Sequence, residues 1–586
     1  MERIRTYDNL RVYANVPLAV EMAKAQTGQD IFEYDFSFKW DLAAAQADEK
    51  SEIKLEWDLP GLDVHYYWHP NVGTRRIFQG EWSQSHTNMM TVSAPVAAMF
   101  SGHDLNAATI ATDEVMRVNS VHLGGQDTDN ILVARVKLPL KQYTGKDSHR
   151  MKARLDLRRV PLYEALGDVA AWWEKALPGS PMEVPEAAKM PMYSSWYAYH
   201  KDIRADELEE QCRLAKQMGM DTIIVDDGWQ TGVNSGAYGY TGDWQVWPGK
   251  IPDMAVHVRK VHEAGLKYML WYSVPFIGHF AKGWEKYKDK ILYDVPRLNC
   301  AVLDPRYPEV REFLIGTYVR AVEEWDLDGF KLDFIDSFVA QGDAPVKQGM
   351  DFTCVQEATR ALMLGVVSAL KKIKEDILIE FRQSYIGPMM RQFGNMFRVG
   401  DCASDIASNR IGTIDLRMLS GNTAVHSDML SWSHDETPED AALQILHSIF
   451  GVIQFSQIIT DMPESHRRMS AFWLGFARKN KKVLLESELI PYEPQYLYPV
   501  VKAQDDMHAI VGVYQRGKIA DLPDRQKVSF INASREETLY IRCGEGRRAK
   551  ATVRNTLGEI VREEEIVFSG ITPVSVPNSG LLELVF

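Results

Sequence analysis

Hydrophobic and polar positions along this chain of 586 residues fall into three successive patterns. Up to about residue 157, short runs alternate apolar and polar side chains, as at 65–69 and 131–136, with turn residues between them. This period of two predicts half-buried β-strands. A helical run at 162–176 leads into a Pro-rich stretch at 177–185, which is the best candidate linker. From about residue 486 helical periodicity disappears and strand-like runs return.

Between these β-rich ends, short apolar runs alternate with amphipathic helical stretches. The strand candidates fall at 193–196, 222–225, 268–272, 329–333, 377–381, 396–399, 423–426 and 452–455. Eight strands in about 270 residues, with helices between most of them, predict a (β/α)8 barrel. A doubly wound open sheet is the competing fold, but no Gly-x-Gly-x-x-Gly follows the first strand.

The expected fold class is therefore multidomain, α/β and β. We expect an N-terminal β-sandwich with its linker helix at residues 1–176 and a central (β/α)8 TIM barrel at 187–485. A small C-terminal β-sandwich is expected to occupy residues 486–586.

Composition and charge narrow the possible partners. The formal charge of −14 argues against nucleic acid or an anionic membrane, because phosphate binding needs concentrated Lys and Arg. No stretch approaches the ~20 apolar residues of a membrane span, and no apolar signal segment is evident at the N-terminus. Five scattered cysteines without paired metal spacing suggest reduced thiols. We expect a cytoplasmic protein that binds neither nucleic acid nor membrane.

Chemistry-bearing side chains gather where the barrel strands are predicted to end. A (β/α)8 barrel carries its site at these C-terminal ends, in the loops that follow. Each of the first seven predicted strand ends carries an acid, a base or a Trp; the segments are Trp196, Asp226-Asp227-Gly228-Trp229, Trp271, Lys331-Leu332-Asp333, Glu380-Phe381-Arg382, Arg398-Val399-Gly400-Asp401 and His426-Ser427-Asp428.

Many carboxylates and aromatics without a nucleotide motif favour glycoside hydrolysis. A metal site is the rival use of adjacent acids, but few His accompany them. We therefore expect no metal and no cofactor, and an oligosaccharide or other glycoside as the partner.

The residue pattern alone suggests roles for several acids. Lys331 and Asp333 are two apart, so they share one face of a strand, and the cation favours an ionised carboxylate that can act as a nucleophile. Asp401, after Arg398, could oppose it as the acid. Asp405 is a rival acid/base, or else a cap for the following helix.

In this order, the motifs resemble the α-galactosidases of glycoside hydrolase family 36 and, more distantly, family 27. The resemblance rests on Trp196, Asp226-Asp227-Gly228-Trp229, Gly242-Asp243-Trp244, Leu303-Asp304-Pro305, Lys331-Leu332-Asp333-Phe334, Glu380, the Arg398–Asp401 segment and His426-Ser427-Asp428-Met429. It implies an exo-acting retaining enzyme, with Asp333 as nucleophile and Asp401 as acid/base. Asp226 and Asp227 match the acids that hold the 4- and 6-hydroxyls of a terminal galactose.

The resemblance also implies the remaining substrate contacts. Lys331 and Arg398 match cations that contact ring hydroxyls, and three tryptophans would form an apolar wall, namely Trp196, Trp229 and Trp271. Because relatives often assemble, a homo-oligomer is compatible with the resemblance.

The chain departs from the family after Glu380, where a Cys and small residues usually face the 2-hydroxyl. Here the bulkier Phe381-Arg382-Gln383 follows, and Arg382 is expected to contact substrate. This departure leaves open a related α-glycosidase or transglycosidase, acting for example on an α-N-acetylgalactosaminide or a β-L-arabinopyranoside. A non-catalytic sugar-binding barrel is the alternative of a different class.

Overall fold

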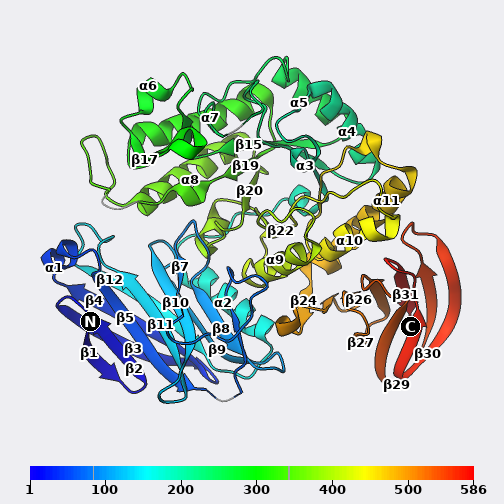
Figure 1. The fold of residues 1–586 in the computed structure, drawn as a ribbon, viewed down its shortest axis with the longest axis horizontal. Helices are drawn as coiled ribbons and strands as arrows, with labels where there is room; N and C mark the ends of the chain where they lie inside the picture. The colour runs from blue at the N-terminus through cyan, green and yellow to red at the C-terminus, as the bar shows by residue number, and fades with distance from the viewer. Residues whose placement is uncertain (62, 84, 236, 341–343) are drawn as a thin grey trace.

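The N-terminal part of the chain is a sandwich of two antiparallel sheets (Figure 1, blue). The computed structural model describes residues 1–61, 63–83, 85–235, 237–340 and 344–586. One sheet runs β1 (Glu2–Tyr7), β2 (Leu10–Ala14), β5 (Glu52–Pro60), β11 (Ile131–Pro139), β10 (Asn119–Gln126), β7 (His86–Asn88). The other runs β3 (Leu18–Gly28), β4 (Ile31–Trp40), β12 (Ser148–Asp156), β9 (Asn106–Thr112), β8 (Val96–Phe100), β6 (Tyr66–Trp68). Apolar side chains from both sheets, Trp57 and Phe36 among them, form one core between them.

Eight parallel strands from the middle of the chain form a closed ring, which lies above the two β parts in Figure 1 (cyan-green to yellow). The strands are β13 (Met192–Ser194), β14 (Thr222–Val225), β15 (Lys267–Ser273), β19 (Gly329–Asp333), β20 (Leu378–Arg382), β21 (Met396–Arg398), β22 (Ala424–His426) and β23 (Gln454–Phe455). β13 pairs with both β14 and β23, and a parallel bridge between His426 and Val452 closes the ring. The barrel expected from the sequence is confirmed.

Helices surround the ring and connect its strands. Those of the barrel are α3 (Trp196–Tyr199), α4 (Ala205–Gln217), α5 (Met254–Glu263), α6 (Trp284–Tyr287), α7 (Pro308–Trp325), α8 (Val355–Ile373), α9 (Ile406–Leu419), α10 (Pro438–Ser448) and α11 (Glu464–Lys479). After β15 the chain also forms a small antiparallel sheet, of β16 (Phe276–Gly278), β17 (Ile291–Val295) and β18 (Cys300–Leu303), which the sequence pattern did not reveal.

The C-terminal part is a single sheet of eight strands (Figure 1, orange to red). Its strands are β24 (Glu488–Tyr492), β25 (Val500–Gln504), β26 (His508–Val513), β27 (Ile519–Asp521), β28 (Lys527–Asn532), β29 (Thr538–Arg554), β30 (Ile560–Ser575) and β31 (Leu581–Val585). The long strands β29 and β30 pair along most of their length, and the curled sheet encloses its own apolar cluster, which includes Phe530 and Phe568. The fold class is therefore confirmed, with a curled sheet at this end.

One buried carboxylate joins the three parts. Asp415 on α9 accepts hydrogen bonds from Trp68 Nε1 at 3.0 Å, Arg76 Nη2 at 2.7 Å and Tyr498 OH at 2.6 Å. Trp68 ends β6, Arg76 follows it, and Tyr498 lies between β24 and β25. Helix α2 (Leu162–Ala176), which leads from the sandwich to the barrel, packs against α9 as well. Across the described ranges, no helix combines the length and apolarity needed to cross a bilayer.

Candidate active site

Asp333, at the end of β19, has hydrogen-bond donors on both carboxylate oxygens. Trp271 Nε1 donates to Oδ2 at 3.0 Å, Arg382 Nε donates to Oδ1 at 2.8 Å, and the Tyr385 hydroxyl also donates to Oδ1. Its side chain retains 9% exposure. Burial opposes its ionisation, but Arg382 and Lys331 outweigh burial, so the pKa of Asp333 lies well below its ordinary value. This carboxylate is ionised at neutral pH.

Lys331 acts on Asp333 from a distance, because its ammonium contacts a different acid. The Lys331 ammonium is hydrogen-bonded to Asp226 Oδ2, at the end of the second strand. Arg382 is therefore the cation in direct contact with the candidate nucleophile. Arg382 lies in the segment after Glu380 where the sequence departs from the family it resembles, and here it stabilises the anionic form of Asp333.

Asp226 and Asp227 lie together at the end of β14, and both are buried. Lys201 Nζ lies 3.0 Å from Asp227 Oδ2, and Gln230 Nε2 donates to Asp227 Oδ1 at 2.7 Å. Burial raises the pKa of Asp227, and Lys201 opposes that rise. Each of the two acids thus has its own lysine partner.

Asp401, by contrast, is open to solvent. Its side chain is 60% exposed, and Arg398 Nη2 donates to its Oδ1 at 2.9 Å. Burial raises its pKa, but Arg398 and then Arg382 and Lys331 outweigh burial, so the pKa of Asp401 is lowered. The same two cations, Arg382 and Lys331, thus lower the pKa of both Asp333 and Asp401.

Buried hydrogen bonds and ion pairs fix the position of Arg398, the partner of Asp401. The Arg398 guanidinium also donates to Asp428, at the mouth of the seventh strand, and Asp428 Oδ2 accepts from Tyr197 OH at 2.9 Å and from Cys402 N at 2.7 Å. Arg398 Nε lies 3.8 Å from Glu380 Oε1. Burial raises the pKa of Glu380 to about 6, against the opposing effect of Arg398.

The three predicted tryptophans have different positions. Trp271 is almost fully buried and reaches Asp333. Trp229 is fully buried, donates to the Trp271 carbonyl at 2.9 Å and packs between Trp244 and Trp325. Trp196 begins α3, stays partly exposed and packs edge-on against His200. Trp229 therefore presents no exposed face, and it supports Trp271 from behind.

Several residues at the site were not among the predicted contacts. Tyr385 and Lys201 lie in loops three and seven residues beyond their strands, and Tyr238 stacks on Trp271 with ring centroids 6.1 Å apart. Asp428 lies just beyond the end of β22, and this position is the sequence signal by which it could have been predicted as a site residue. Asp405 caps α9, accepting from Ala407 N at 3.1 Å and Ser408 N at 3.0 Å.

Fold and site together define a barrel of the glycoside-hydrolase type, with carboxylates from strands on opposite sides of its mouth. Within the described residues, no group of three His, Cys, Asp or Glu side chains is arranged to hold a metal ion.

Comparison with known proteins agrees with this class. Residues 185–388 match the family model described as Melibiase. The α-galactosidase Mel36A of Lactobacillus acidophilus is 28% identical over 200 residues, which cover 32% of this chain and 26% of that protein. The bifunctional α-galactosidase/sucrose kinase AgaSK of Mediterraneibacter gnavus is 26% identical over 148 residues, covering 24% of this chain and 16% of that protein. The matched segments thus span about a quarter or less of these curated relatives.

Solved structures match over almost the whole chain. The α-galactosidase of Lactobacillus brevis superposes with a TM-score of 0.65 at 13% identity, covering 99% of this chain and 82% of that one. A family 36 α-galactosidase, an AgaA variant of Geobacillus stearothermophilus in complex with raffinose, gives 0.64 at 13% identity, covering 100% and 84%. The resemblance to family 36 α-galactosidases that the sequence suggested is confirmed, and at this identity the structural likeness concerns the fold.

Proposed function

We propose that the protein is a retaining exo-α-galactosidase that releases terminal α-linked galactose through a covalent glycosyl-enzyme. One observation carries the proposal: Asp333, at the end of the fourth strand, is held ionised by Arg382 and Lys331 with donors on both oxygens. An oxygen nucleophile needs this ionised state. The raffinose bound by an AgaA variant and the stachyose bound by another support α-galactosyl oligosaccharides as the substrate class.

In the first step the Asp333 carboxylate attacks the anomeric carbon, and the bond to the leaving oxygen breaks as Asp401 donates a proton to that oxygen. Water then attacks the anomeric carbon while Asp401 takes its proton, and Asp333 leaves as a carboxylate. Asp226 and Asp227 grip the 4- and 6-hydroxyls, since carboxylates accept two strong hydrogen bonds.

The acid step requires a change at Asp401, because its pKa is lowered in the free protein. A sugar placed against this exposed carboxylate removes water from it, and desolvation favours the neutral form. The lowered pKa suits the second step, in which Asp401 must be ionised to act as a base.

A panel of aryl glycosides tests the proposal. It includes α-galactoside, α-glucoside, α-N-acetylgalactosaminide and β-L-arabinopyranoside, because Arg382 occupies the segment where the sequence departs from its relatives. We expect turnover of the α-galactoside above the others, at a level unaffected by chelator. Preference for another sugar would replace the assigned specificity, and no turnover of any member would favour the sugar-binding alternative.

Asp333→Gly tests the assigned nucleophile. Turnover should fall by several orders of magnitude, and added azide should restore some activity by attacking the exposed α-glycoside to give a β-glycosyl azide. An α-azide product would show that the roles of Asp333 and Asp401 are exchanged. We also propose a cytoplasmic location, supported by five free cysteines of which four are buried.

A further inference from the structure

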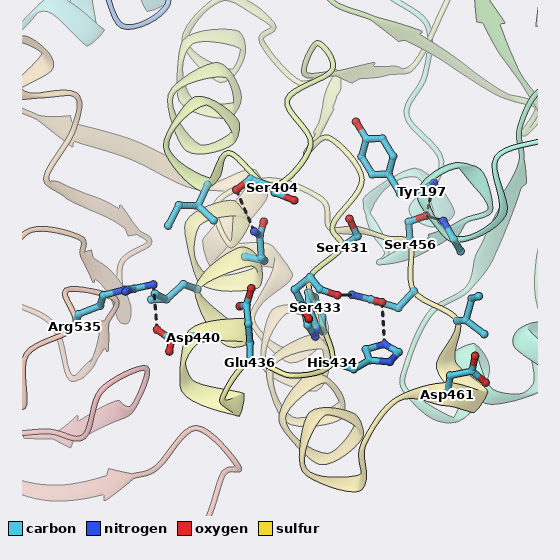
Figure 2. Close-up of a pocket in the computed structure, with 17 residues that line it drawn as sticks. Tyr197, Ser404, Ser431, Ser433, His434, Glu436, Asp440, Ser456, Asp461 and Arg535 are labelled. Carbon is cyan, nitrogen blue, oxygen red and sulfur yellow. Dashed lines mark hydrogen bonds and ion pairs between the residues drawn. The ribbon is translucent and has the colours of Figure 1, made fainter. Parts of the chain in front are cut away.

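A polar groove opens beside the candidate active site, at the rim of the barrel next to the C-terminal sheet. It has a volume of about 730 Å³, within the range of about 300–1,000 Å³ typical of ligand sites. Its walls come from the loops that follow β21, β22 and β23, from α10, and from Arg535 of the C-terminal part (Figure 2). We call it the rim groove.

The position of the rim groove follows from the order of the barrel strands. The acids assigned to the 4- and 6-hydroxyls stand on the second strand, and Asp401 stands after the sixth. With these assignments, and with Asp333 on the fourth strand, a bound galactose ring would have its anomeric carbon between the fourth and sixth strands, away from the second. A leaving group must pass the acid that protonates it, so it leaves on the Asp401 side.

The rim groove begins on that side. Ser404, three residues after Asp401, lines it, and Gln444 Nε2 donates to the Ser404 carbonyl at 3.3 Å. Tyr197 also lines it while its hydroxyl binds Asp428, which holds Arg398. Tyr197 and the loop that carries both Asp401 and Ser404 thus border the candidate active site and the rim groove.

The lining side chains fit a neutral, hydroxyl-rich ligand. Of the carboxylates, Asp440 is paired with Arg535 at 3.0 Å, whereas Glu436 and Asp461 have no ion pair among the described residues (Figure 2). Both are exposed acceptors for hydroxyl donors. His434 and Gln457, bonded to each other at 3.2 Å, add further polar atoms, and the unpaired acids disfavour an anionic ligand.

We propose that the rim groove binds the leaving-group portion of an oligosaccharide substrate, beyond the sugar unit next to the cleaved bond. The inference rests on the proposed function and adds to it a binding site for the leaving group of the longer substrates. A longer α-galactosyl oligosaccharide reaches the rim groove, and a small aryl galactoside does not. Glu436 and Asp461 then raise kcat/KM for long substrates only.

The test compares an aryl α-galactoside with α-galactosyl tri- and tetrasaccharides in Glu436→Ala, Asp461→Ala and the double variant. Asp435→Ala is the matched control, because Asp435 neighbours Glu436, is also exposed and carries the same charge but does not line the rim groove. Thermal unfolding verifies that each variant is folded.

Each lost hydrogen bond to a charged acceptor should lower kcat/KM for the tetrasaccharide by about tenfold. The aryl galactoside should be unaffected, and Asp435→Ala should behave as the native protein with every substrate. If the aryl galactoside and the tetrasaccharide respond alike, or if Asp435→Ala produces the same loss, the rim groove is not the binding site. Failure to hydrolyse any α-galactoside would overturn the proposed function itself, which is a separate and recognisable outcome.

Discussion

Replacing Tyr385 by Phe tests how the charge on Asp333 is controlled. The variant removes one oxygen, whose hydroxyl donates to Asp333 Oδ1, and leaves Arg382 Nε and Trp271 Nε1 in place. A hydrogen bond to a charged group contributes about 1.5–3 kcal/mol, which corresponds to about one to two units of pKa. The pKa of Asp333 should rise, yet Arg382 and Lys331 still hold the carboxylate ionised at neutral pH.

The two chemical steps should respond differently to this loss. Asp333 begins the first step as an anion and becomes an ester, so a more basic carboxylate attacks at least as well. In the second step it must leave as an anion, and it now lacks one donor. If the whole hydrogen-bond energy of about 1.5–3 kcal/mol is lost in this step, breakdown of the glycosyl-enzyme slows by about 10- to 150-fold.

Stopped-flow measurement with an activated aryl α-galactoside separates the steps. Tyr385→Phe should show a burst of phenolate, a lower kcat and a lower KM, with kcat/KM changed little. Tyr193→Phe is the matched control, since its buried hydroxyl donates instead to the Gln457 carbonyl at 2.9 Å. A loss of kcat/KM as large as the loss of kcat, without a burst, would refute this reasoning.

Three further substitutions test separate parts of the structure. Asp227→Asn should reduce kcat/KM for α-galactosides about 10- to 100-fold with little effect on α-glucosides. An unchanged sugar preference would show that Asp227 does not bind the hydroxyl that distinguishes these sugars. Asp401→Ala should reduce turnover of substrates with poor leaving groups about 10²–10⁴-fold but spare glycosyl-enzyme formation from activated aryl substrates, a difference that a merely structural role would not produce. Asp415→Ala should lower the free energy of unfolding by about 3–5 kcal/mol in denaturant titration, because it leaves Arg76 buried without its carboxylate partner. A change under about 1 kcal/mol would show that the contacts of Asp415 between the three parts contribute little to stability.

The barrel could be predicted closely from the sequence because its signal is local and repeated. The strands β14 and β19 and the helix α2 have the predicted bounds, since buried strands and amphipathic helices each follow their own period. Because a barrel carries its site at the strand ends, the acids at those positions could be proposed as candidates before any contact between them was known. The small sheet from β16 to β18 escaped prediction, because its short strands interrupt the expected strand-helix alternation.

Contacts made by loops could not be predicted in this way. Sequence spacing placed Lys331 beside Asp333, but the long lysine side chain extends to Asp226, and Arg382 from the next strand fills the place at Asp333. Tyr385 and Lys201 come from irregular segments, whose path depends on the whole packed structure. The contacts of Asp405 likewise depend on the folded chain: its side chain accepts hydrogen bonds from the first turn of α9, as a helix cap does.

The two candidate catalytic acids differ in what can change their charge. Asp333 is buried among fixed donors, so its ionisation is set by the folded protein before any ligand arrives. Among the residues that the structure describes, Arg398 is the cation paired with Asp401; Asp428 competes for the same guanidinium, while most of the Asp401 side chain faces water. Removing that water by binding a sugar should raise the pKa of Asp401 more than that of Asp333, which is already buried. If the two acids act as proposed, substrate binding creates the difference in protonation that a double displacement requires.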